Sequence, residues 1–168
     1  MPPSGAETLF LCGPMGSGKS TVGRALAARL GRRFVDTDDV VVRQTGYTIE
    51  ALFAQFGEAA FRAHETDALA SAIDPPGAVV ALGGGALLAL ENRALIEQAG
   101  RCIFLRAPLE TLERRLARSN IRRPLLARAS IGSIVAARLP LYEAADLTVD
   151  VDDDEAPDAT AARIAALL

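Results

Sequence analysis

Residues 13–21 read GPMGSGKST and directly follow the apolar run Leu9–Cys12. This stretch contains the pattern G-x-x-x-x-G-K-[ST], in which a loop between a strand and a helix turns its backbone N–H groups toward bound phosphates. Both flanks fit, because Leu9–Cys12 suits a buried strand and Ser20–Leu30 repeats apolar residues at helical spacing. The sequence therefore predicts a protein that binds a nucleoside triphosphate.

Each part of this phosphate-binding loop has an expected role. Lys19 is expected to reach the β- and γ-phosphates, and the Ser20 hydroxyl is placed to ligate Mg²⁺. The glycines let the backbone approach the phosphates without a clash from a β-carbon. The predicted ATP-binding residues of the loop are Gly13, Pro14, Met15, Gly16, Ser17, Gly18, Lys19, Ser20 and Thr21.

Composition favours a compact enzyme of one domain, residues 1–168, since 168 residues suffice for one well-buried core. The net charge of −3 argues against nucleic acid as a partner. No apolar run is long enough to span a bilayer, and the first residues, MPPSGAE, lack the features of a signal peptide. We therefore expect a cytoplasmic protein without a membrane partner. Cys12 and Cys102 lie in apolar runs, where cysteine packs as a small hydrophobic residue rather than forming a disulfide or a metal site.

Short apolar runs alternate with helical patterns along the chain. This alternation predicts an α/β fold, with a parallel sheet covered by helices on both faces. The expected strands are Leu9–Cys12, Phe34–Val35, Val79–Leu82, Ile103–Leu105 and Leu147–Val151. Gly31 and Gly100 are expected to end helices, and the acidic run 150–155 is expected to be a solvated turn before the last helix, Ala159–Leu168.

Asp36-Thr37-Asp38 follows the second expected strand, where open α/β sheets place their ligands. Two carboxylates two residues apart on an extended segment point the same way, so both can face one cleft. One can hold Mg²⁺ through water while the other orients an acceptor hydroxyl. The alternative is a helix cap, with Asp38 or Asp39 capping the helix that follows.

Two further motifs carry donors for a ligand. Arg62 and Glu65 are three apart on an expected helix, so Glu65 can fix the guanidinium in place, although such pairs are often weak surface contacts. Gly83, Gly84 and Gly85 follow the strand Val79–Leu82 and expose backbone donors, unless they form only a wide turn. No aspartate ends that strand, which favours Asp36 as the acidic metal ligand. We assign His64 no catalytic role.

The segment 114–128 is rich in arginine and contains Arg122-Arg123-Pro124, a composition that suits a mobile lid. Farther on, Arg138 precedes Pro140, which is expected to interrupt or kink its helix. Arg62 and Arg138 offer paired forks suited to a carboxylate, and Asp38 with the three glycines offers contacts suited to hydroxyls. A small hydroxylated carboxylic acid satisfies all of these groups.

The ordered set GPMGSGKST, DTD, FRAHE, GGG, RRPLL and RLPLY resembles the shikimate kinase family over nearly the whole chain, from Leu9 to Leu168. The resemblance implies a fold of the nucleoside-monophosphate-kinase type with a five-stranded parallel sheet. It also implies a substrate-binding region at about residues 37–65 and a lid at about 114–128. The implied reaction is phosphorylation of the 3-hydroxyl of shikimate by ATP, in the pathway to chorismate and the aromatic amino acids.

The resemblance also implies roles for single residues. Lys19 and Arg123 stabilise the transferring phosphoryl group, and Asp38 orients or deprotonates the hydroxyl. Ser20 and Asp36 hold one Mg²⁺ per active site. The implied shikimate ligands are Asp38, Arg62, Gly83, Gly84, Gly85 and Arg138. Members of the family often carry an adenine-stacking arginine where this chain has Leu116, so Arg115 is the nearest equivalent if the lid holds one extra residue.

Three alternatives stay open from the sequence. Gluconate kinase or another small P-loop kinase shares the fold and the loop, although FRAHE, GGG and RLPLY argue against it. A nucleotide kinase needs a second base-sized pocket, and this chain has no tryptophan and few aromatic residues. A sensor domain binds nucleotide or shikimate without turnover, but the full set of expected catalytic residues favours an enzyme. We expect a monomer whose partners are shikimate and ATP.

Overall fold

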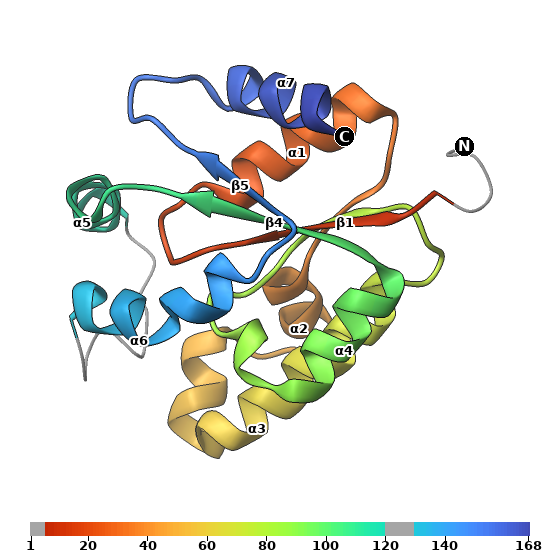
Figure 1. The fold of residues 1–168 in the computed structure, drawn as a ribbon. Helices are drawn as coiled ribbons and strands as arrows, with labels where there is room; N and C mark the ends of the chain where they lie inside the picture. The colour runs from red at the N-terminus through yellow and green to blue at the C-terminus, as the bar shows by residue number, and fades with distance from the viewer. Residues whose placement is uncertain (1–5, 120–129) are drawn as a thin grey trace.

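The computed structural model describes residues 6–119 and 130–168. Five parallel strands form one sheet in the order β2-β3-β1-β4-β5 (Figure 1). The strands are β1 Thr8–Cys12, β2 Phe34–Asp36, β3 Val79–Ala81, β4 Gly100–Arg106 and β5 Leu147–Asp150. The predicted α/β fold with a five-stranded parallel sheet is confirmed, and β4 is longer at both ends than its apolar run suggested.

Helices connect the strands and pack on both faces of the sheet. They are α1 Lys19–Leu30, α2 Thr37–Thr45, α3 Ile49–Ala72, α4 Leu90–Ala99, α5 Leu109–Arg118, α6 Ile131–Glu143 and α7 Pro157–Leu167, with a 3₁₀ turn at Ala86–Leu88. Helix α3 is broken by one non-helical residue, Gly57, whose φ is 84°. Helix α6 continues through Pro140 rather than ending there. Arg114–Arg118 belongs to α5, so the predicted lid begins inside a helix.

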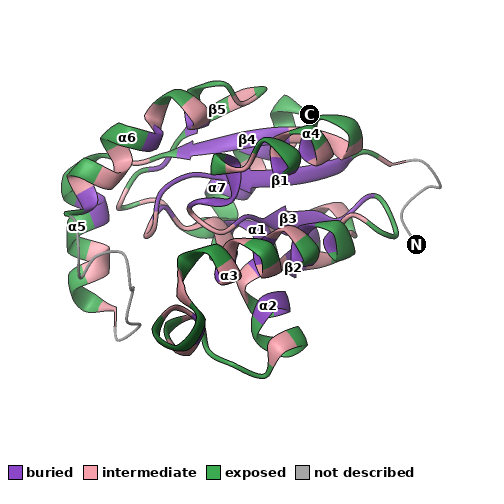
Figure 2. Cartoon of the chain, turned by 90° about the horizontal axis from the view of Figure 1, so that it is seen from below, coloured by how far each residue is buried: buried purple, intermediate pink, exposed green. Residues whose placement is uncertain are grey.

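The core has two layers, one on each side of the sheet, and β1 contributes to both. Leu9 and Leu11 pack with α1 and α7, whereas Phe10 and Cys12 pack on the opposite face, where α2, α3 and α4 lie (Figure 1). This alternation follows from the two-residue period of a strand. Strands β1 and β4 are buried along most of their length (Figure 2). Cys12 and Cys102 are buried and form no disulfide, as predicted.

The chain leaves β1 and β3, the two strands at the centre of the site, toward opposite faces of the sheet. β1 pairs with β3, with Leu11 opposite Ala81. After β1 the chain enters α1 on one face, and after β3 it enters the 3₁₀ turn and α4 on the other. Where adjacent strands diverge in this way, a crevice opens at their carboxyl ends and receives ligands. The phosphate-binding loop and residues 83–85 meet at this crevice.

The acidic run at the end of β5 lies in a loop before α7, as predicted, but several of its carboxylates are paired. Asp150 binds Arg106 with two hydrogen bonds, and Glu155 binds Arg163 in the same way. The run is therefore a set of salt bridges rather than a solvated turn alone. Within residues 6–119 and 130–168, no helix is both long and apolar enough to cross a membrane.

Candidate active site

The phosphate-binding loop needs its glycines for both backbone conformation and space. Gly13 has φ of 144°, and a β-carbon there would lie 2.8 Å from the carbonyl oxygen of Leu105 on the neighbouring strand β4. Gly18 precedes α1 in the left-handed region with φ of 92°. The loop therefore wraps against β4 and delivers the N-terminus of α1 to the crevice, where its partial positive charge favours phosphate.

Two side chains from the start of α1, predicted to contact phosphate and metal, lie at the phosphate-binding loop and at the end of β2. Lys19 folds over the loop, and its ammonium group donates to the carbonyl oxygens of Gly13 at 2.7 Å and Pro14 at 2.9 Å. The Ser20 hydroxyl donates to Oδ2 of Asp36 at 2.5 Å. Ser20 lies in the helix that follows β1, and Asp36 is the last residue of β2. The structure thus brings together the two predicted magnesium ligands.

Asp36 and Asp38 do not share one extended segment, so that prediction is wrong. β2 ends at Asp36 and α2 begins at Thr37, because the Asp36 carboxylate accepts hydrogen bonds from the backbone N–H groups of Asp38 and Asp39 and caps the helix. Neither Asp38 nor Asp39 is the cap. Asp38 instead lies in the first turn of α2, and its side chain faces residues 83–85.

Asp38 is the carboxyl group with the most perturbed environment in the crevice. Burial, followed by the negative charges of Asp36 and Glu65, raises the pKa of Asp38 to about 6, against the opposing charge of Lys19. A carboxyl group with this pKa is largely ionised at neutral pH, yet is a stronger base than an ordinary aspartate. The environment suits a group that accepts a hydrogen bond from a substrate hydroxyl.

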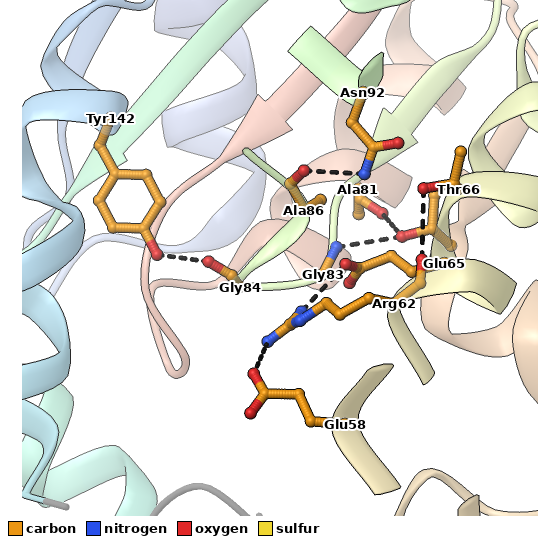
Figure 3. A network of polar contacts seen from close by, with 11 residues as sticks. Glu58, Arg62, Glu65, Thr66, Ala81, Gly83, Gly84, Ala86, Asn92 and Tyr142 are labelled. Atoms are coloured by element: carbon orange, nitrogen blue, oxygen red, sulfur yellow. Dashed lines mark hydrogen bonds and ion pairs between the residues drawn. The ribbon is translucent and has the colours of Figure 1, made fainter. Parts of the chain in front are cut away.

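Arg62 is held in place by two carboxylates, as Figure 3 shows. Its guanidinium donates to Glu65 at 3.0 Å and to Glu58 at 3.2 Å, and it packs over the ring of Phe61. The Glu65 side chain is only 2% exposed, so its contact with Arg62 is not a surface pair. The predicted role of Glu65 in fixing Arg62 therefore agrees with the geometry. Glu58 was not predicted.

Residues 83–85 form the glycine turn, and at Gly83 and Gly85 the side chains of Glu65, Asp38 and Arg62 approach the backbone too closely for a β-carbon. At Gly83 a β-carbon would lie 2.5 Å from Oε2 of Glu65 and 2.9 Å from Oδ1 of Asp38. At Gly85 it would lie 2.5 Å from Nη1 of Arg62. A wide turn without a ligand role would not need this closeness, so the glycine turn forms one wall of the crevice.

Polar side chains from three elements hold the glycine turn in place. The Thr37 hydroxyl accepts from Gly83 N at 3.0 Å, and the Tyr142 hydroxyl donates to Gly84 O at 2.6 Å (Figure 3). Just beyond the turn, the Asn92 side chain donates to Ala86 O at 2.9 Å. The turn is therefore fixed to α2, α6 and α4 before any ligand arrives.

Arg138 reaches the glycine turn from α6. It is 7% exposed, and its Nη1 lies 3.6 Å from the position of a β-carbon on Gly84. Met15 of the phosphate-binding loop lies at 3.7 Å from the same position. The structure thus brings Arg62, Asp38 and Arg138 to three successive glycines beside the phosphate-binding loop.

A groove of about 340 Å³ borders the phosphate-binding loop on the other side, toward β5 and α7. Arg115 lines it and donates to Gly16 O at 3.0 Å and to Asp153 at 3.3 Å. Asp153 also pairs with Arg114 at 2.7 Å. Arg115 therefore connects the phosphate-binding loop to the loop before α7. The predicted phosphate ligand Arg123 lies outside the described residues.

A larger cavity, about 920 Å³, lies beyond this groove at the edge of the sheet. It is lined by Arg106, Asp150 and Arg163, whose charges are already paired with one another or with Glu155. Neither a residue of the phosphate-binding loop nor one of the glycine turn lines it. Of these two cavities, the smaller groove is the one lined by residues of the phosphate-binding loop.

The fold and the site define a P-loop kinase that acts on a small molecule, because a phosphate-binding loop faces an acceptor wall built from arginines, a carboxylate and a glycine turn. The chain belongs to the shikimate kinase family, whose model, described as Shikimate kinase, matches residues 15–168. It is 45% identical to the shikimate kinase of Stenotrophomonas maltophilia over 161 residues, which cover 93% of this chain and 89% of that protein. It is 44% identical to that of Paramagnetospirillum magneticum, over 94% of this chain and 82% of that protein.

Solved structures give the same result. A shikimate kinase from Acinetobacter baumannii in complex with shikimate aligns with a TM-score of 0.90 and 36% identity, covering 98% of this chain and 93% of that one. The APS kinase of Mycobacterium tuberculosis, in complex with AMPPNP and APS, aligns with a TM-score of 0.63 at 21% identity, over 98% of each chain. The second likeness shows a shared fold alone.

Three residues with contacts in the site, Glu58, Tyr142 and Asp153, were given no role from the sequence. Glu58 lies four residues before Arg62, a spacing that places both on one helix face and could have been read. Tyr142 and Asp153 had no such local signal, because each contacts a residue more than 35 positions away.

Proposed function

We propose that this chain transfers the γ-phosphoryl group of ATP to the 3-hydroxyl of shikimate and forms shikimate 3-phosphate, on the pathway to chorismate and the aromatic amino acids. The observation that carries the proposal is the approach of Asp38, Arg62 and Arg138 to the glycine turn beside the phosphate-binding loop. Membership of the shikimate kinase family supports it, as does the likeness to the A. baumannii enzyme in complex with shikimate.

In this proposal the acceptor binds through its carboxylate and its hydroxyls. Arg62 at Gly85 and Arg138 at Gly84 hold the carboxylate between two guanidinium groups, since planar forks match a carboxylate in geometry and charge. Asp38 at Gly83 accepts a hydrogen bond from the 3-hydroxyl and aims it at the γ-phosphate. A loose transition state needs little proton abstraction early on, so orientation by Asp38 matters more than its basicity.

Lys19 and Arg123 neutralise charge on the transferring phosphoryl group in this proposal. Ser20 and Asp36 hold one Mg²⁺, whose chemistry would be to neutralise charge on the β- and γ-phosphates. The donor set suits that ion, because a hydroxyl and a carboxylate within 2.5 Å of each other offer hard oxygen ligands. The described residues contain no group of three or more His, Cys, Asp or Glu side chains that could hold a metal. Magnesium at a kinase site keeps waters and phosphate oxygens as most of its ligands, so two protein oxygens suffice for the proposed site.

Arg115 contacts the adenine in this proposal, in the groove between the phosphate-binding loop and the start of α7. Its position against Gly16 O supports the assignment. We also propose that the chain works as a single domain and as a monomer in the cytoplasm. The two core layers on one sheet support the single domain, and the proposed use of ATP suits the cytoplasm.

The test is ADP release by the purified protein with ATP and Mg²⁺, with shikimate, gluconate or nucleoside monophosphates as acceptors. Release that depends on shikimate alone is the expected result. ADP release with gluconate or a nucleoside monophosphate would show that the acceptor is not shikimate. The role of the phosphate-binding loop would be unaffected by that result. Shikimate binding by calorimetry without any ADP release would instead indicate a sensor domain.

A further inference from the structure

Tyr142 is a buried side chain with a polar contact that the proposed chemistry does not use. It is 2% exposed, and its ring stacks on Phe104 with centroids 5.3 Å apart and an interplanar angle of 22°. Its hydroxyl donates to Gly84 O at 2.6 Å, across 58 residues of sequence (Figure 3). A ring alone would fill the same space, so the hydroxyl needs its own explanation.

We propose that Tyr142 is a positioning residue for the acceptor, and that its hydrogen bond to Gly84 fixes the place of Arg138 relative to the glycine turn. This inference rests on the proposed binding of shikimate. Tyr142 and Arg138 are four residues apart on α6, so both lie on the face that meets the turn. A bond from Tyr142 to Gly84 therefore sets the distance from Arg138 to Gly84 as well.

The bond matters because Pro140 weakens the tie between the last turn of α6, which carries both residues, and the rest of the helix. Pro140 lies between them and has no N–H to donate to the carbonyl of the preceding turn. Contacts outside the helix must then set how this last turn of α6 meets the glycine turn. Among the described contacts of α6, the bond from Tyr142 is the hydrogen bond that joins the helix to the glycine turn.

The charge around Tyr142 supports the same link. Burial raises the pKa of Tyr142 while the nearby Arg138 guanidinium opposes the shift, so the hydroxyl keeps its proton and lies within reach of the arginine's charge. A protonated hydroxyl can donate to the Gly84 carbonyl and still accept from the guanidinium beside it, so one side chain contacts both the glycine turn and Arg138. The tyrosine thus holds the backbone while the arginine meets the acceptor.

Tyr142→Phe tests the proposal, because it keeps the ring and its stack on Phe104. Steady-state kinetics should show a KM for shikimate raised about tenfold, with kcat lowered less than about threefold and the KM for ATP unchanged within about twofold. This split is expected because a fixed Arg138 binds the carboxylate equally in the ground state and the transition state. An unchanged KM for shikimate, or equal increases for shikimate and ATP, would overturn the proposal.

Thr8→Val is the matched control. It removes another buried hydroxyl, which accepts from Gly77 N at the opposite end of β1. It should lower the melting temperature without changing either KM. A rise in the KM for shikimate in this variant equal to that in Tyr142→Phe would attribute the effect to general destabilisation and overturn the positioning role.

Double variants separate Arg138 from Arg62 as the group through which Tyr142 acts. In an Arg138→Lys background, Tyr142→Phe should raise the KM for shikimate by less than about threefold, whereas in an Arg62→Lys background it should still raise it about tenfold. Equal effects in both backgrounds would overturn the link to Arg138. Absence of shikimate-dependent turnover in the wild-type protein would overturn the proposed function itself. Normal wild-type turnover together with an unchanged KM for shikimate in Tyr142→Phe would overturn this inference alone.

Discussion

Replacing Arg62 with alanine should weaken shikimate binding and destabilise the fold through two separable effects. Arg62 is proposed to hold the shikimate carboxylate, and it also donates to Glu65, which is 2% exposed. Loss of the first contact leaves the acceptor's carboxylate with one of its two proposed guanidinium partners, Arg138. Loss of the second leaves Glu65 buried without the guanidinium that donates to it. Binding and stability therefore need to be measured on the same variants.

The two magnitudes follow from these contacts. Truncating one partner of a buried charge pair at a binding site costs about 2–5 kcal/mol, which corresponds to shikimate binding weakened by about thirtyfold to several thousandfold. Breaking the buried pair with Glu65 destabilises the fold by up to about 3–5 kcal/mol. The stability loss should lie near the lower end, because burial already raises the pKa of Glu65 and the carboxyl group can take up a proton once Arg62 is gone.

This protonation gives the stability loss a pH dependence of known sign. Without Arg62 the pKa of Glu65 in the folded protein rises further above its value in the unfolded chain. Between those two values the folded state binds more protons than the unfolded state, so stability falls as the pH rises. The destabilisation of Arg62→Ala should therefore be larger at pH 8 than at pH 5.

Calorimetric titration with shikimate and urea unfolding at the two pH values measure these effects. Adding Glu65→Gln to Arg62→Ala should restore part of the stability and remove its pH dependence, without restoring binding. Arg29→Ala is the control, because Arg29 pairs with Asp158 on the exposed surface, and it should change both quantities little. Shikimate affinity within about twofold of wild type in the Arg62→Ala protein would refute its place in the site.

Three further predictions concern the nucleotide side and the acid–base group. Lys19→Ala should lower kcat by at least about a hundredfold, because a charge near the transferring phosphoryl group is lost, and near-normal single-turnover rates would contradict this. Arg115→Ala should raise the KM for ATP about tenfold and leave the KM for shikimate unchanged, since Arg115 lies at Gly16 on the nucleotide side. In the ligand-free protein the Asp38 carboxyl should titrate with a pKa of about 6, measured by carbon NMR. Its protonated form should therefore increase as the pH falls through that value. A titration at the ordinary pKa of an aspartate would show that burial does not perturb it.

The parts of the structure that could be predicted are those whose signal is local. The phosphate-binding loop, the start of α1 and the five strands follow from residue spacing and apolar runs. Arg62 and Glu65 could be paired because three residues on a helix place them on one face. The single local error of consequence concerned Asp36. The helix cap is Asp36, whose own backbone is still extended, and it lies two and three residues before the predicted caps Asp38 and Asp39.

Contacts between distant segments could not be predicted from the sequence alone. Spacing indicates that the three glycines suit a ligand. Only packing brings Glu65, Asp38 and Arg62 within 3 Å of the β-carbon positions of Gly83 and Gly85. The arginine-rich segment 114–118 was interpreted by composition as part of a lid, whereas Leu112 and its neighbours bury one face and make the segment the end of α5. A high arginine content indicates that one face of such a segment is exposed. It does not predict whether the backbone is helical.

Asp36 connects the two halves of the site, because each oxygen of its carboxylate has a different task. Oδ1 accepts from the N–H groups of Asp38 and Asp39 and fixes the start of α2. This helix carries Asp38, which is proposed to orient the hydroxyl of the acceptor. Oδ2 accepts from Ser20 at the start of α1, which carries the phosphate-binding lysine. With Oδ1 engaged in the cap, only Oδ2 is available for a metal, and a metal there must take the place of the Ser20 hydrogen bond. The proposed magnesium site and the first turns of α1 and α2 thus share one side chain. A change at Asp36 should therefore alter the position of Asp38 even where the phosphate-binding loop stays intact.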